Sequence, residues 1–147
     1  MKRIFLILFA VLLTGIAAWI LYFLTSNDLN IQGGLPFMVL LNILFVSNMA
    51  LILYVTYRVA QGEPISDRWL ETIKQIGGFA AAWGTWSTIL GLFYAFDAIE
   101  ASKEVIPFQV ICGGLKVAVI TVEYGLIIFC HSLLAYIGLN LSRTQVA

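Results

Sequence analysis

Long apolar runs separated by short polar stretches are the dominant pattern of this 147-residue chain. A helix needs about 20 residues to cross a bilayer core of roughly 30 Å. Four runs reach that length, over residues 4–24, 36–57, 73–96 and 106–139. The pattern therefore predicts an all-α integral membrane protein with about four transmembrane helices. The last run is too long for a simple span, so we expect it to project beyond the membrane into the cytoplasm.

The polar stretches divide the chain into three parts. We predict two N-terminal transmembrane helices over residues 1–60, a short cytoplasmic linker over residues 61–75, and a pair of helices over residues 76–147. Within the linker, Ser66 or Asp67 is expected to cap a short helix that leads into the third span.

Composition and charge support a membrane protein. The chain is 61% hydrophobic, more apolar surface than a soluble domain of this size could bury. Its formal net charge is zero, whereas a nucleic-acid-binding protein is expected to carry an excess of basic residues. If the spans alternate, the positive-inside rule places both termini in the cytoplasm. Six basic residues then share the cytoplasmic side, with Lys103 on the other: Lys2, Arg3, Arg58, Arg68, Lys74 and Arg143.

The first run could also be a signal peptide, because it follows Met-Lys-Arg and contains small residues. It is longer than the usual apolar region of such a peptide, which favours a retained anchor.

Small residues recur along one face of each of the last two runs. In the third run these are Gly84, Thr88, Gly91 and Ala95, and in the fourth Gly114, Ala118, Thr121, Gly125 and Ser132. Small residues let a neighbouring backbone come close, and a threonine hydroxyl can hydrogen-bond across the contact or line a wet path. Simple helix packing explains the glycines. For Thr88, polar and in the middle of its run, packing and an ion path both remain open.

Glu123 is an acidic residue deep in the last run. An ionised acid at the centre of a membrane costs roughly 2.5 to 3.5 kcal/mol, so Glu123 should be neutral, paired, or facing water or protein. Lys116 lies about 10 Å away along the axis, so an intersubunit partner is more plausible. Glu123 points roughly 100 to 200° away from Val122 and Thr121, so it can flank the small face without belonging to it. An ion path, a neutral acid in a helix interface and a subunit contact all remain open.

His131 lies two turns further along and carries a group that titrates near neutral pH. It is interpreted either as a structural histidine or as a proton relay. One histidine beside one cysteine does not form a metal site. The sequence also lacks a catalytic triad order, a phosphate-binding loop and a carboxylate pair. We therefore expect no catalytic residues, no metal and no cofactor.

Two motifs in the second half carry a family resemblance. The segment from Gly84 to Leu139 resembles the MotA/TolQ/ExbB proton-channel family. The first motif appears as Gly84, Ser87, Thr88, Gly91, Ala95, Phe96 and Ile99; the second appears as Gly113, Gly114, Ala118, Thr121, Gly125, Leu126 and Tyr136. Three positions depart from the pattern: the family's acidic residue falls on Val117, its second threonine on Val122 and its proline on His131. The long cytoplasmic insertion of better-known members is also absent.

The resemblance implies a pentameric ring of such chains around a dimer of a single-span ExbD/TolR/MotB-like protein, whose membrane aspartate receives the proton. Thr88 would then line the ion path, with Thr121 or Glu123 in place of the second threonine. The implied function is a subunit of a proton-driven motor (stator) or energy-transducing channel in the bacterial inner membrane. The alternative is a non-conducting structural or assembly subunit. A compact four-span exporter is disfavoured, because the first span carries no acid.

Overall fold

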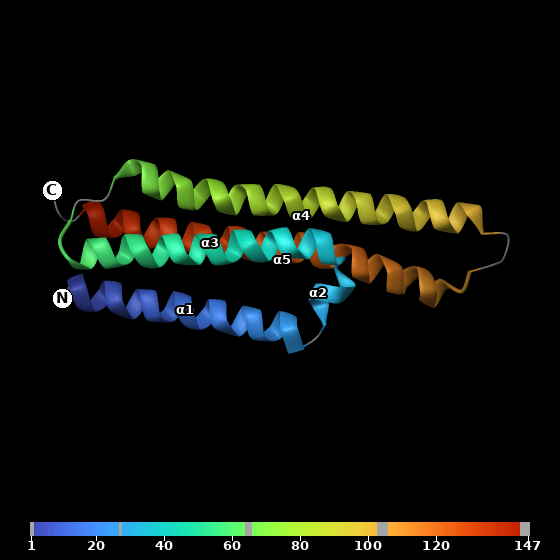
Figure 1. Ribbon diagram of the computed structural model, residues 1–147, viewed down its shortest axis with the longest axis horizontal. Coiled ribbons are helices and arrows are strands. Elements are labelled where there is room, and N and C mark those ends of the chain that lie inside the picture. The colour runs from blue at the N-terminus through green and yellow to red at the C-terminus, as the bar shows by residue number, and fades with distance from the viewer. Residues whose placement is uncertain (1, 27, 64–65, 103–105, 145–147) are drawn as a thin grey trace.

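The computed structural model describes residues 2–26, 28–63, 66–102 and 106–144, and their regular structure is entirely helical (Figure 1). The long helices run along one axis in alternating directions, and the first helix begins at the end of the bundle where the last helix ends. The helices are α1 (Lys2–Ser26), α2 (Leu29–Gln32), α3 (Leu35–Ala60), α4 (Asp67–Ala101) and α5 (Phe108–Thr144). The predicted all-α fold is confirmed.

Among the described residues, three helices are long and apolar enough to cross a membrane: α3, α4 and residues Phe108–Ser142 of α5. In α1, the apolar stretch found among the described side chains is shorter, Leu8–Phe23. The chain is therefore a multi-pass membrane protein, and the fourth span remains a prediction.

Buried side chains form two clusters along the bundle. One lies toward α2 and includes Phe45 and Tyr124, whose rings meet edge to face with centroids 6.1 Å apart. The other lies toward the termini and includes Ile52, Ile73 and Leu139. Both clusters combine residues of α3 and α5 with residues of α1 and α4, and the buried polar residues Asn48, His131 and Ser132 lie between them along the chain.

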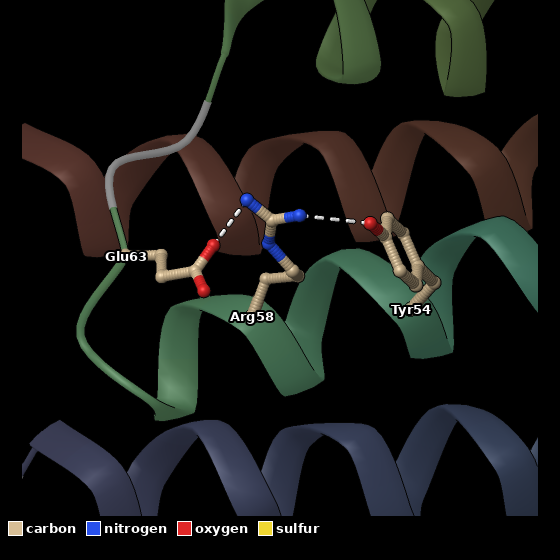
Figure 2. A network of polar contacts seen from close by, with 3 residues as sticks. All are labelled: Tyr54, Arg58 and Glu63. Atoms are coloured by element: carbon tan, nitrogen blue, oxygen red, sulfur yellow. Dashed lines mark hydrogen bonds and ion pairs between the residues drawn. The ribbon is translucent and has the colours of Figure 1, made fainter.

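The end of α3 illustrates how a span stops near the membrane surface. Gly62 adopts a positive φ of 90°, and the amide of Glu63 donates to the carbonyl of Arg58 (3.2 Å), the pattern of a glycine-terminated helix. The Arg58 guanidinium donates to the Tyr54 hydroxyl (2.9 Å) and forms an ion pair with Glu63 (Figure 2). These polar groups close the helix without burying an unpaired charge.

The helix α4 begins at Asp67 and runs without a break, so it includes much of the stretch expected to be a linker. Ser66 stands at the N-cap position, but its side chain makes no capping hydrogen bond. The expected short helix and the third span are therefore one continuous element.

The hairpin of α4 and α5 extends past the other helices at the end away from both termini (Figure 1). The expected projection of the last helix into the cytoplasm is not confirmed, since the part of α5 that extends is its beginning. Under the predicted orientation this end is non-cytoplasmic. That orientation stays a prediction: Lys103 and the side chains of Lys2, Arg3 and Arg143 lie outside the described residues.

We expect the connection between α2 and α3 to lie at one membrane boundary. Gly33 and Gly34 are not helical, and lipid-exposed irregular backbone does not occur within the hydrocarbon region. Ile120 of α5 lies at this level, because a Cβ atom on Gly33 would be 3.2 Å from its side chain. About 20 residues further along α5, close to Asn140, a distance of roughly 30 Å has been crossed. With a boundary there, the hydrocarbon region would cover α5 from about residue 120 to residue 140.

Candidate ion pathway between the last two helices

Two glycines bring the backbones of α4 and α5 into direct contact. A Cβ atom on Gly84 would collide with the carbonyl oxygen of Thr121, and one on Gly125 would collide with the carbonyl oxygen of Ala80. The two contacts are reciprocal, since each helix supplies one glycine and one carbonyl. A glycine inside a helix costs about 1 kcal/mol relative to alanine, and here the close approach offsets that cost.

Thr88 and Thr121 meet across the same contact. Their hydroxyl oxygens are 3.0 Å apart, within hydrogen-bond distance, and either can donate. Thr121 is 3% exposed, whereas Thr88 is half-buried, so the pair is accessible from the α4 side. Two hydroxyls that each donate and accept can exchange hydrogen bonds with water or with a protonated group.

The depth of this pair in the membrane stays a prediction. Thr88 and Thr121 both lie well inside the candidate spans of their helices, Asp67–Ala101 and Phe108–Ser142. Thr121 follows Ile120, the residue level with the α2–α3 connection.

Glu123 does not join the threonines. It is exposed on the side of α5 that faces α1, where it lines two adjoining pockets. Among the described side chains, none forms an ion pair or hydrogen bond with it. The structure thus brings together two of the three residues expected along the ion path and separates the third from them.

His131 links α5 to α1. It is 3% exposed, and its Nε2 atom lies 3.3 Å from the carbonyl oxygen of Leu13, which can only accept a hydrogen bond. Its ring also packs edge to face on Phe45, with centroids 5.8 Å apart. These contacts tie α5 to α1, while its Nδ1 atom has no partner among the described residues. A relay role for His131 stays a prediction.

The other small residues fall into two groups. A Cβ atom on Gly91 would be 3.7 Å from the Cβ atom of Ala118, an ordinary packing distance, and Ala95 on the same helix is half-buried. Gly113 and Gly114 are exposed and have open space where a side chain would be. Their expected packing role is not fulfilled within this chain.

Two amides of α3, buried Asn48 and half-buried Asn42, form contacts that were not predicted from the sequence. Asn48 donates to the Ser132 hydroxyl, and Asn42 accepts from the Tyr124 hydroxyl (2.8 Å) while donating to Asn30 of α2 (3.0 Å). Two asparagines in an otherwise apolar run were the available signal, because polar side chains inside a membrane protein need partners. These bonds tie α2 and α3 to α5.

No cluster of three or more histidine, cysteine, aspartate or glutamate side chains suited to hold a metal occurs among the described residues. The chemistry available between α4 and α5 is therefore hydrogen bonding by hydroxyls inside a tight helix contact.

These features define a multi-pass membrane protein whose last two helices form a glycine-packed hairpin with paired threonines. The chain belongs to the MotA/TolQ/ExbB proton channel family, whose sequence profile matches residues 47–146. The match begins within α3, well before Gly84, where the sequence motifs begin. No curated protein and no solved structure matches the chain significantly.

Proposed function

We propose that this chain is a subunit of a proton-driven motor or energy-transducing channel of the bacterial inner membrane. Several copies, five by family resemblance, form a ring around a dimer of a single-span ExbD/TolR/MotB-like partner. Protons pass along the α4–α5 hairpin to an aspartate of the partner, and the resulting movement does work on the partner's non-cytoplasmic part.

The observation that carries this proposal is the hydrogen bond between Thr88 and Thr121 inside the reciprocal glycine contact. Family membership supplies the class of transported ion. Since Glu123 lies on another face of α5, the proposed path depends on the two hydroxyls.

The extended end of the hairpin supports assembly with other chains. Phe93, Tyr94, Phe96 and Phe108 are between 58% and 75% exposed, and they lie near or beyond the α2–α3 connection. Apolar side chains at or outside the membrane boundary are stabilised when another protein surface covers them. Exposed Gly113 and Gly114 would allow such a surface to come close.

The test is partner-dependent proton flux into liposomes that contain the co-purified complex. Thr88→Val and Thr121→Val should each reduce the flux, because valine keeps the shape and removes the hydroxyl. Thr85→Val is the matched control: Thr85 is also on α4, but its hydroxyl bonds to the carbonyl of Ala81 in its own helix (2.8 Å). The proton flux through the Thr85→Val complex should be unchanged.

An assembled complex in which the double variant Thr88→Val, Thr121→Val conducts normally would overturn the proposed pathway. A complex that assembles with its partner but conducts no protons in any form would establish the structural or assembly subunit instead.

A further inference from the structure

A groove between α1 and α5 contains a carboxylate that the proposed function does not use. Two adjoining pockets of about 350 and 240 Å³ make up this groove, and Glu123 lines both. Their other walls are almost wholly apolar: Ile16, Trp19, Ile20, Phe23 and Leu29 from α1 and α2, and residues of α5 between Ile120 and Leu134. An ionised carboxylate in such surroundings is stabilised by a cation or a hydrogen-bond donor.

The depth of the groove matches one leaflet of a bilayer. Glu123 lies three residues, or about 4.5 Å, inside the boundary marked by Ile120. From Glu123 to Leu134 the groove continues for about 16 Å, close to half of the roughly 30 Å hydrocarbon thickness. Trp19 stands beside Glu123 in the groove wall, and tryptophan is typical of the headgroup level.

The described cations of the chain do not provide a partner. Arg58, Arg68 and Lys74 belong to the opposite end of the bundle, and Lys116 lies about 10 Å further out along α5. In a ring of parallel copies, equal residues lie at equal depth. The Lys116 of a neighbouring copy would therefore also be about 10 Å from the level of Glu123.

We propose that the α1–α5 groove binds one phospholipid with a primary ammonium headgroup, as in phosphatidylethanolamine. The ammonium donates to the Glu123 carboxylate, and one acyl chain lies along Ile127, Cys130 and Leu134. An ammonium offers three donors to a carboxylate, whereas an anionic lipid headgroup meets a like charge. The site is distinct from the threonine pair and does not depend on proton conduction.

The experiment is native mass spectrometry of the complex purified with its partner and equilibrated with equal amounts of phosphatidylethanolamine and phosphatidylglycerol. We expect about tenfold more bound phosphatidylethanolamine than phosphatidylglycerol, because a charge-assisted hydrogen bond can provide a preference of this size. Glu123→Gln should reduce this preference to near unity. Ile127→Trp should displace bound lipid of both kinds, whereas Val39→Trp, on an exposed part of α3 outside the groove, should not.

Cys130 gives a second measurement in nanodiscs, because it lines the groove and is exposed, while Cys112 is exposed elsewhere. Alkylation of Cys130 should be slower with phosphatidylethanolamine present than with phosphatidylglycerol alone, and that of Cys112 should not change. Equal binding of the two lipids by the native chain would overturn the proposal. So would oxidative cross-linking of Cys130 to another copy, which would show that a neighbouring chain fills the groove.

Discussion

Replacing Gly84 by alanine tests the backbone contact on which the hairpin depends. The new Cβ atom would overlap the carbonyl oxygen of Thr121, and the α carbon of Val122 would be 3.2 Å away. Both neighbours are backbone atoms, so no side-chain rotation can relieve the overlap. The two helices must move apart instead.

The expected loss of stability follows from two opposing terms. Overpacking a tight contact costs about 1–3 kcal/mol, and an obstacle in the backbone places this case near the upper value. Alanine recovers up to about 1 kcal/mol through its higher helix propensity. The net decrease in the free energy of unfolding is therefore about 2 kcal/mol. Gly125→Ala should behave alike, because its Cβ atom would meet Ala80 in the same way.

Unfolding of the purified chain by sodium dodecyl sulfate in mixed micelles, followed by tryptophan fluorescence, measures this change. Gly114→Ala is the matched control, since nothing lies within 4 Å of its new Cβ atom. That variant should be unchanged or up to about 1 kcal/mol more stable. If Gly84→Ala and Gly114→Ala unfold at the same detergent fraction, the close α4–α5 contact is not present in the protein.

Two further predictions concern other parts of the bundle. Ser132→Ala removes the acceptor of the buried Asn48 amide and should lower the free energy of unfolding by about 1 kcal/mol in the same assay; an unchanged midpoint would show that the amide finds another partner. Exposed Cys112 should react with a membrane-impermeant maleimide from the non-cytoplasmic side of intact cells. Reaction only in inside-out vesicles would reverse the predicted orientation of both termini.

Hydropathy predicted where the helices lie but not where they end. The run over residues 36–57 became α3 (Leu35–Ala60), and the run over residues 73–96 became α4 (Asp67–Ala101). Hydropathy reports contact with lipid, whereas a helix continues into polar sequence until a residue such as Gly62 ends it. Because the stretch after Ser66 is polar, it was expected to be a short helix leading into the third span, whereas it is the first part of α4.

The angular positions of the site residues around their own helices could be predicted from the sequence, but the contacts between helices could not. Helical spacing allowed Glu123 to flank the face that carries Thr121 without belonging to it, and in the structure Glu123 lines pockets beside α1. The hydrogen bond between Thr88 and Thr121 depends on the crossing point of two helices, which spacing along one helix does not define. The groove beside Glu123 depends on α1, a segment far away in the sequence. For Gly113 and Gly114, sequence could not distinguish packing within one chain from packing between chains.

The reciprocal contact of Gly84 and Gly125 restricts how this protein can move. Sliding α4 along α5 by one residue would shift the backbones by about 1.5 Å and replace a glycine at the contact with a side chain. Each helix therefore holds the other in register in both directions. If the chain is a motor subunit as proposed, α4 and α5 would therefore move together as one rigid unit.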